Sequence, residues 1–481
     1  MLNQSFSAQN FENIFDIENR KGNIKSVHLS HEYLENANSI KECRAILKSY
    51  TKRRKRTTSS RLKDLLEKKE TEIKIQIEEL LVQKKEIRNA DLEEISKIIN
   101  HHNFKFNLTP KDDDKFVIEN SKESFFAIKQ LQHNIRKTFG VKQGNRHTIL
   151  SQIKLLLNDS SPKYVIRTDV THFFESISQE KLLKKVENNT LLNRQSKAFI
   201  RQILKEYNNI KDRDEIDPNR GVPRGVGISA YLSELYMKDI DNTICKLPDV
   251  IYYARYVDDI FIIISPSLPK KDLNRDYYAI IKNIVSKEDL SLKDVGDDKC
   301  TLLDLSVPNV GEKIVTYLGY AIHIGKQGNK TTATFGLSES KKKKIRNRIT
   351  KSIAYFNNTN KYNINKARKE LLLCLRFLCT NTKLSGTKSR VKTGIYYSND
   401  LLDVEHINDI SDFNQFLDDR LKICGLSPHD KLFVDNEKKQ QYIDYLTDQI
   451  NKTIDCQRGF NEKTYHTFSI NDMKTIKRIL Q

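Results

Sequence analysis

The sequence predicts a chain of mixed helices and strands, of the α/β or α+β class, and three observations support this prediction. Apolar residues recur at helical spacing across much of residues 1–120. Strand-like and helix-like patterns alternate over residues 121–330. Helical spacing then returns over residues 331–481. A sheet backed by helices is therefore expected in the middle of the chain, between two helical regions.

The first region is charged and helical. From Arg61 to Asn100, leucine and isoleucine recur at helical spacing among Lys and Glu, which predicts one long amphipathic helix or a helical pair. The basic run Lys52–Arg56 precedes this stretch. A solvated run of charges explains this stretch, and contact with a nucleic acid is the alternative.

The middle region contains short apolar runs separated by helical stretches. These runs favour strands because they are rich in β-branched and aromatic residues. The expected strands are Tyr164–Thr168, Val250–Ala254, Ile260–Ile264 and Ile314–Tyr317. The expected helices are Lys181–Tyr207 and Ser229–Asp241.

The charge of the chain is positive and unevenly placed. The 481 residues include 83 Lys+Arg and 63 Asp+Glu, a formal net charge of +20. Residues 331–400 carry 16 Lys+Arg and 3 Asp+Glu, so 16 − 3 = +13, whereas residues 401–481 carry 11 and 14, so 11 − 14 = −3. A cationic stretch of this kind predicts a polyanionic partner.

The seven cysteines and the lengths of the apolar runs indicate the expected cellular compartment. The cysteine count is odd and no Cys-x-x-Cys occurs, which favours a reduced, intracellular protein over a disulfide scaffold or a zinc ribbon. No signal peptide is apparent after Met1, and the apolar runs are too short to span a bilayer. A cytoplasmic protein without a membrane partner is expected.

Three carboxylates are candidate metal ligands. Asp258 and Asp259 lie between two apolar runs, and like charges so close repel unless a cation with a preference for oxygen ligands is bound. Asp169 follows the strand predicted over Tyr164–Thr168. Brought together, the three can hold two Mg²⁺ ions about 3.5–4 Å apart for in-line phosphoryl transfer from a triphosphate to a 3′-hydroxyl. An ordinary hairpin turn is the alternative, because Asp is common in turns.

A glycine- and proline-containing loop, Gly221–Ser229, opens into a predicted helix between these carboxylates. Glycine allows a close approach of the backbone to a ligand, and a helix N-terminus suits an anion. By itself this signal is weak, because many loop-to-helix junctions have the same composition.

The order of these motifs resembles the palm of reverse transcriptases. Asp169 with Phe173-Phe174 resembles motif A, Gly221–Leu232 resembles motif B, and Tyr256–Asp259 resembles motif C. Three further stretches resemble the motif D lysine, the motif E primer grip and the basic finger motif: Lys299, Tyr317–Tyr320 and Val141–Arg146. Six motifs in the same order favour the metal centre over the turn.

The resemblance implies a role for each matched residue. Two Mg²⁺ ions are expected on Asp169, Asp258, Asp259 and the backbone carbonyl of Val170. The nucleotide is expected at Lys142, Arg146, Val170, Phe174, Arg224 and Gly225, with Phe174 as the gate against ribose. Lys299 is the expected general acid, and Leu318 and Gly319 the primer grip. Solvation of the basic side chains and core packing of the phenylalanines are the alternatives.

Three positions depart from the family pattern. Arg224 stands where many relatives have Gln, which puts ordinary templating in doubt. Cys300 follows Lys299 where Thr is usual, and Val257 is a frequent variant within motif C.

Residues 142–167 and 381–399 also resemble bacterial abortive-infection and other defence-associated reverse transcriptases. That resemblance implies an α+β right-hand polymerase with three regions. These are a helical N-terminal extension (1–120), fingers and palm (121–330) and an all-helical, thumb-like C-terminal region (331–481). The basic segment 331–400, with Lys341–Lys344 and Lys383–Lys392, is expected to line the nucleic-acid path, where tyrosines can stack on bases.

The expected function is RNA-directed or template-independent DNA synthesis from dNTPs in phage defence. The expected partners are an RNA template or non-coding RNA and the DNA product, and a homo-oligomer or a partner defence protein is left open. The alternatives are an inactive RNA-binding scaffold, a retroelement reverse transcriptase and an RNA-dependent RNA polymerase. Phe174 argues against the last, because an aromatic gate excludes ribose.

Overall fold

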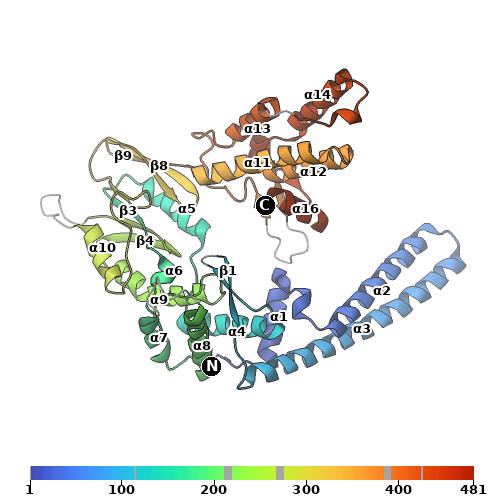
Figure 1. Ribbon diagram of the computed structural model, residues 1–481, viewed down its shortest axis with the longest axis horizontal. Helices are drawn as coiled ribbons and strands as arrows, with labels where there is room; N and C mark the ends of the chain where they lie inside the picture. The colour runs from blue at the N-terminus through green and yellow to red at the C-terminus, as the bar shows by residue number, and fades with distance from the viewer. Residues whose placement is uncertain (1, 113–114, 211–218, 267–275, 384–391, 424–425) are drawn as a thin grey trace. The chain divides into compact units, whose positions relative to one another are not determined.

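The computed structural model describes residues 2–112, 115–210, 219–266, 276–383, 392–423 and 426–481. The chain divides into two compact units, each built from segments that are separate in the sequence (Figure 1). The first unit holds Met1–Gln143, His172–Asn242 and Val285–Leu290. The second unit holds Gly144–Thr171, Thr243–Ile284 and Ser291–Gln481. The division predicted at residues 120 and 330 stays a prediction.

Helices make up most of the first unit. They are α1 (Ala8–Lys21), η1 (Ser26–His28), α2 (His31–Arg56), α3 (Ser60–Asn100), α4 (Lys122–Phe139), α6 (Phe173–Ser176), α7 (Gln179–Glu187), α8 (Arg194–Ile210) and α9 (Ser229–Cys245). An antiparallel pair, β1 (Leu108–Asp112) and β2 (Lys115–Ile118), accompanies them. The predicted helices around residues 181–207 and 229–241 are confirmed, the first as the two helices α7 and α8.

The helices α2 and α3 lie side by side as a helical hairpin (Figure 1). The seam buries Tyr33, Ile40 and Cys43 of α2 and Leu66, Glu70 and Ile77 of α3, and Arg54 pairs with the buried Glu70. Spacings of three, four and seven residues are typical of two helices packed as in a coiled coil. The long helix predicted from the apolar spacing is therefore confirmed, and its partner is the preceding helix.

A four-stranded antiparallel sheet with the order β4–β5–β3–β6 positions the site in the second unit. The strands are β3 (Tyr164–Asp169), β4 (Val250–Tyr256), β5 (Asp259–Ile264) and β6 (Thr301–Asp304). β5 is buried without interruption from Ile260 to Ile264, as its continuous apolar sequence predicts. The predicted strand at 164–168 and both arms of the predicted hairpin are confirmed.

A second antiparallel sheet follows in the same unit. It consists of β7 (Val310–Tyr317), β8 (Tyr320–Gln327) and β9 (Lys330–Leu337). Burial alternates along β8, so that Tyr320, Ile322 and Ile324 face the core. Helix α5 (Arg146–Leu157) packs on β9 and adds Ile149 and Ile153 to that core.

The remaining helices of the second unit are α10 (Tyr277–Ser286), α11 (Glu339–Thr359), α12 (Ile364–Cys379), α13 (Ser411–Ile423), η3 (Asp430–Leu432), α14 (Asn436–Thr453), α15 (Cys456–Asn461) and α16 (Ile470–Leu480). Apolar residues of α11, α12 and α13 continue the core that lies under the β7–β9 sheet. Within the described part of the chain, no helix has the length and apolar character needed to cross a membrane.

The prediction of an entirely helical region after residue 330 is wrong. β9 continues to Leu337, and a small sheet with the order β11–β10–β12 consists of β10 (Asn381–Lys383), β11 (Lys392–Gly394) and β12 (Tyr465–His466). The buried Asn381 side chain holds it, donating to Gly459 O at 2.9 Å and accepting from Tyr396 N at 2.9 Å. Strands of two or three residues are too short to show an alternating pattern. The basic stretch 384–391 lies outside the described residues.

Candidate metal centre

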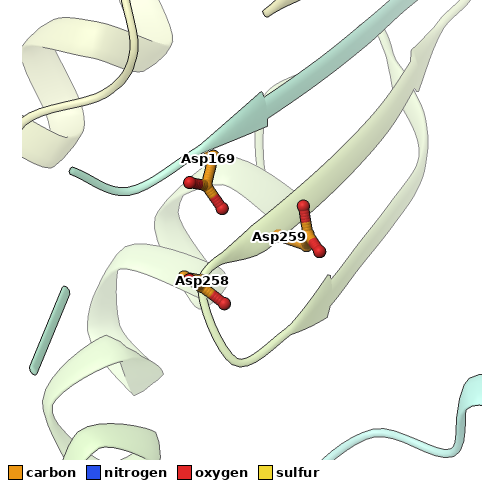
Figure 2. Close-up of side chains that lie close together, drawn as sticks. All are labelled: Asp169, Asp258 and Asp259. Carbon is orange, nitrogen blue, oxygen red and sulfur yellow. The ribbon is translucent and has the colours of Figure 1, made fainter. Parts of the chain in front are cut away.

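Three carboxylates that are distant in the sequence meet at the ends of two neighbouring strands. Asp169 is the last residue of β3 and Asp259 the first residue of β5, and the antiparallel register places them opposite each other. Asp258 lies in the turn before β5. One carboxylate oxygen from each residue lies within 4.8 Å of the other two. Figure 2 shows the three side chains gathered at this edge of the sheet.

A strained two-residue turn holds Asp258 in place. Val257, its first residue, has a φ of 63°, a left-handed conformation that a β-branched residue rarely adopts and that costs of order 1–3 kcal/mol. Two hydrogen bonds support the turn. Arg255 Nη1 donates to Val257 O at 2.8 Å, and Val170 N donates to Asp258 O at 3.2 Å. The second bond ties the turn to the end of β3.

Two basic side chains pair with the carboxylates. Arg167 lies two residues before Asp169, so both point to the same face of β3. The buried Arg167 guanidinium donates to Asp259 Oδ1 at 2.8 Å. Lys299 Nζ donates to Asp169 Oδ2 at 2.9 Å. Each pair offsets part of the cost of bringing carboxylates out of water.

The positive charge at the site does not balance the carboxylates fully. Burial raises the pKa of Asp259, and the Asp169 and Asp258 carboxylates raise it further, although the Arg167 guanidinium lowers it. A raised pKa means that the ionised form is disfavoured at this position. A bound cation would remove this disadvantage.

One buried oxygen atom indicates where a cation fits. Among the described residues, no hydrogen-bond donor reaches Asp169 Oδ1, which is inaccessible to solvent. Buried carboxylate oxygens in proteins nearly always have a partner. A hard divalent ion takes oxygen ligands, so this atom and the neighbouring carboxylates of Asp258 and Asp259 form a donor set that suits a metal ion.

The predicted ligand Val170 and general acid Lys299 lie at the same edge. Val170 is buried and forms an isolated bridge with Leu292, which fixes its backbone beside Asp169. The hydrogen bond to Asp169 raises the pKa of Lys299, so its ammonium group is fully charged at neutral pH. Carbonyl ligation by Val170 and proton transfer by Lys299 stay predictions.

Arg146 lies in a second cluster, beside the predicted primer grip. The turn residues Leu318 and Gly319 have positive φ values of 45° and 77°, the pattern of a type I′ hairpin turn. A Cβ atom on Gly319 would lie 2.9 Å from Arg146 Nη2, so glycine leaves room for the guanidinium. Arg146 and Lys341 both lie over the Tyr320 ring, at 5.8 and 5.0 Å from its centroid. Burial and the Arg146 charge lower the pKa of Lys341 to about 8.

The other predicted nucleotide-binding residues belong to the first unit. Phe173 is buried and stays in the core, whereas Phe174 is half-buried. The carbonyl of Phe174 accepts a hydrogen bond from Val222 N at 2.9 Å, which ties motif A to the loop of motif B. Lys142 is exposed. The nucleotide-binding roles of Lys142 and Phe174 stay predictions.

The motif B loop is held against β2. Arg224 is exposed, and its carbonyl accepts a hydrogen bond from Phe116 N at 2.7 Å. Gly225 has a φ of 94°, and a Cβ atom there would lie 2.7 Å from Phe116 O. A larger residue at 225 would therefore push the loop away from the strand. The glycine serves this close approach, and its contact with a nucleotide stays a prediction.

Sequence reasoning missed two basic residues of the metal centre, Arg167 and Arg255. Arg167 and Arg255 each interrupt an otherwise apolar strand, and a charge in a buried strand requires a partner. That signal was available. The sequence predicts Lys341 on the nucleic-acid path only as one of the run Lys341–Lys344, and its position over the Tyr320 ring follows from the fold.

The comparison with protein families identifies the class of this segment. Residues 113–322 match the family model of reverse transcriptases, described as RNA-dependent DNA polymerases. This range contains the three carboxylates, Lys299 and the Leu318–Gly319 turn. The chain therefore contains a reverse transcriptase domain, and this family is one of RNA-directed DNA polymerases, which are nucleotidyltransferases. The resemblance to reverse transcriptases is confirmed at this level.

Among solved structures, the chain is similar to telomerases of two species. One is telomerase from Candida albicans in complex with the TWJ fragment of telomeric RNA, with 13% identity, a TM-score of 0.32 and coverage of 80% of this chain and 62% of that one. Another is apo telomerase from Candida tropicalis, with 13% identity, a TM-score of 0.33 and coverage of 78% and 65%. The chain thus spans less than two thirds of either telomerase. TM-scores this low do not assign a function to the chain. No curated protein sequence matches the chain.

Proposed function

We propose that this chain is a DNA polymerase of the reverse transcriptase type that adds deoxynucleotides from dNTPs to a 3′-hydroxyl. One observation carries the proposal. The carboxylates of Asp169, Asp258 and Asp259 lie within 4.8 Å of one another inside the segment that matches the reverse transcriptase family. Acidic residues at this spacing suit metal-assisted phosphoryl transfer.

The proposed cofactor is Mg²⁺, as two ions held by the three carboxylates and the Val170 carbonyl. When bound, the ions would activate the 3′-hydroxyl and offset the charge of the triphosphate and the leaving pyrophosphate. The unpartnered Asp169 Oδ1 and the raised pKa of Asp259 support a cation at this position. Arg167 keeps Asp259 oriented through its hydrogen bond.

Lys299 is the proposed general acid for the leaving pyrophosphate. Its raised pKa keeps a proton on the ammonium group at neutral pH. Its side chain is half exposed, so it is not confined to Asp169 by packing. Donation of a proton to the leaving group contributes typically 10²–10⁴-fold to such reactions.

The nucleotide is proposed to contact Lys142, Arg146, Val170, Phe174, Arg224 and Gly225. Lys142 and Arg146 supply positive charge for the triphosphate, Arg with the planar fork that suits phosphate. Phe174 is proposed to select deoxyribose, since it is only half-buried whereas Phe173 fills the core. The close contact of Gly225 with β2 supports a fixed shape for the motif B loop.

The proposed nucleic-acid partners are an RNA template or non-coding RNA and the DNA product. Leu318 and Gly319 are the proposed primer grip, and the cations Arg146 and Lys341 beside this turn support a phosphate contact there. Residues 331–400, with a net charge of 16 − 3 = +13, are proposed to line the path.

The proposed biological role is defence against phage, alone, as a homo-oligomer or with a partner defence protein. The support for this role is the resemblance of residues 142–167 and 381–399 to defence-associated reverse transcriptases. Synthesis in that setting is either RNA-directed or independent of a template. Arg224 in place of the usual Gln is the residue that raises the second option.

The test is a nucleotide-incorporation assay on the purified chain with Mg²⁺ and labelled dNTPs or rNTPs, with and without added RNA. Incorporation of dNMP that Asp258→Ala abolishes is expected, and sequencing of the product and of co-purified nucleic acid identifies any template. Phe174→Ala is expected to raise rNMP incorporation. A chain that binds RNA but incorporates nothing would instead be an inactive scaffold.

A further inference from the structure

We propose that the connected end of the α2–α3 hairpin is a second nucleic-acid binding site, which holds a phosphodiester backbone independently of the metal centre. We define the arm tip as residues 48–69, the end of α2, the connection and the start of α3. The arm tip precedes the segment that matches the reverse transcriptase family, which begins at residue 113.

Positive charge is concentrated in the arm tip. Residues 48–69 carry 10 Lys+Arg and 2 Asp+Glu, so 10 − 2 = +8. The rest of the hairpin, residues 31–47 and 70–100, carries 7 and 11, so 7 − 11 = −4. The basic residues of the hairpin are therefore concentrated at one end, apart from most of its acidic residues.

The basic side chains of the arm tip are mostly exposed and lack acidic partners. Arg54 pairs with the buried Glu70 at 2.8 Å, which fixes the register of the two helices. Within the described ranges of the chain, no other Lys or Arg of the arm tip forms an ion pair. Lys69 lies 5.9 Å from the centroid of the Tyr50 ring. The arm tip thus presents a cationic surface that the fold does not neutralise.

Contacts with the rest of the first unit come from the other end of α3. Arg88 pairs with Glu12 and Asp16 of α1, and Glu94 pairs with Lys122 of α4 at 3.4 Å. These acidic and basic residues bind the root of the hairpin. The charge of the arm tip therefore plays no part in attaching it.

Helix stability explains only half of the cluster. Basic residues in the last turn of α2, Arg53–Arg56, are favoured by the negative end of the helix dipole. Arg61 and Lys63 lie in the first turn of α3, at the positive end, where acidic residues are favoured. That turn has no acidic residue, and Ser59 makes no side-chain capping hydrogen bond. An external anion would relieve this arrangement.

The spacing of the lysines suits a polymer of phosphates. Lys48, Lys52 and Lys55 follow one another at i, i+4 and i+7, so they lie on one stripe of α2, successive side chains about one 5.4 Å turn apart. A row of lysines along a helix complements the repeated phosphates of a nucleic-acid chain better than it complements a single small anion. Contacts of this kind read the backbone and not the base sequence.

A nucleic acid fits this surface better than a membrane does. Leu62 and Leu65 are 44% and 50% exposed, but they occupy a single turn, and Tyr50 is the one aromatic residue in the arm tip. A helix that lies in a membrane interface needs a broad apolar face with aromatic anchors. The arm tip has a high positive charge but lacks a broad apolar face.

The experiment measures binding of the full chain to 40-nucleotide single-stranded RNA, the corresponding DNA and their duplexes by fluorescence anisotropy, without nucleotides, over a salt series. The tip variant is Lys52→Gln/Lys55→Gln/Arg56→Gln. The proposal predicts a salt slope, d log K/d log [salt], that is smaller by about 2–3 and an affinity that is lower by at least about tenfold, since each phosphate contact contributes about 0.7–0.9. An effect on one nucleic acid alone would identify that one as the ligand.

The matched control removes the same charge from exposed positions elsewhere on α3, as Lys74→Gln/Lys85→Gln/Lys97→Gln. Its slope is expected to change by less than 1. Equal losses in both variants, an unchanged slope in the tip variant, or binding of anionic phosphatidylserine vesicles in preference to RNA and DNA would overturn the proposal. The binding assay does not depend on catalysis, so a chain without polymerase activity leaves this inference testable. Melting curves of both variants are expected to match that of the parent.

Discussion

The metal centre and the arm tip handle charge in opposite ways. At the metal centre, Arg167 pairs with Asp259 at 2.8 Å and Lys299 with Asp169 at 2.9 Å. The arm tip contains ten basic and two acidic residues, so a net charge of 10 − 2 = +8 is left on its surface. The first region compensates part of its charge within the fold, and the second leaves nearly all of its charge for a partner.

Burial explains the difference. A buried charge without a partner costs several kcal/mol, so the strand ends at the metal centre carry their own counter-charges. An exposed charge costs little, because water and salt screen it. Changes at the metal centre should therefore have large and local effects, whereas changes at the arm tip should have smaller effects that depend on salt.

The largest effect is expected at the carboxylates. Asp258→Asn removes the negative charge of a metal ligand while keeping the shape of the side chain, so dNMP incorporation should fall by about 10³-fold or more, equivalent to about 4 kcal/mol of transition-state stabilisation. Single-turnover primer extension measures the rate of dNMP incorporation. The arm-tip variant should keep its rate on a short primer–template. An Asp258→Asn enzyme with a tenth of the parental rate would disprove the assignment.

A smaller loss is expected at Lys299. Replacing it by Met removes the proposed proton donor, which should lower the rate by about 10²-fold, and Lys299→Arg should recover part of that loss. The matched control is Lys293→Met, because Lys293 pairs with Asp297 at 3.5 Å and touches no carboxylate of the metal centre through its side chain. Pre-steady-state kinetics measures the incorporation rates of both Met variants. Equal rates for the two Met variants would show that Lys299 is a counter-charge and not an acid.

Breaking the Arg167–Asp259 pair tests the burial argument on stability. Arg167→Met leaves Asp259 without its cation and should lower the free energy of unfolding by about 2 kcal/mol, less than for a fully buried pair because Asp259 is 26% exposed. Arg201→Met breaks the exposed pair with Glu187 and should cost less than about 1 kcal/mol. Urea unfolding measures both. Similar losses in the two variants would contradict the comparison.

The pH dependence of metal binding reports on Asp259. Because its pKa is raised, the carboxyl group takes up a proton at a higher pH than an ordinary Asp, and a proton competes with the metal. The metal-free protein gains stability from this group at low pH and loses it as pH rises through the raised pKa. Mg²⁺ affinity should therefore rise with pH, by up to about tenfold per unit below that pKa, and then level off. Calorimetry between about pH 4.5 and 8 measures it.

The control for this titration is Asp259→Asn, which removes the titrating group. Its Mg²⁺ affinity should be low, and the rise with pH should be weaker than in the parent. A rise of the same steepness in both proteins would assign the titration to another group.

The sequence allowed the sheet and its carboxylates to be predicted because both depend on local patterns. The continuous apolar run Ile260–Ile264 predicts a buried strand, and Asp169 follows the shorter apolar run Tyr164–Ile166 after Arg167 and Thr168. Motif order then associated Asp169 with Asp258 without any knowledge of strand register. The register itself, which places Asp169 opposite Asp259, is a property of the folded sheet.

Features that depend on tertiary contacts could not be predicted. The strands β10 to β12 have two or three residues each and are held by the Asn381 side chain, so no periodicity reveals them. The position of Arg146 beside Gly319 joins residues that are distant in sequence, through a gap that only a glycine provides. The pairing of Arg167 with Asp259 likewise follows from the register of β3 and β5.

The most direct test of the central claim, that the three carboxylates form a metal centre, is Mn²⁺ binding to the full chain measured by electron paramagnetic resonance. The parent protein should bind Mn²⁺ saturably, with a second ion in the presence of dNTP. Asp169→Asn, which keeps the size of the side chain and removes its charge, should bind it at least about tenfold more weakly. Equal Mn²⁺ binding by the parent and by Asp169→Asn would contradict the account.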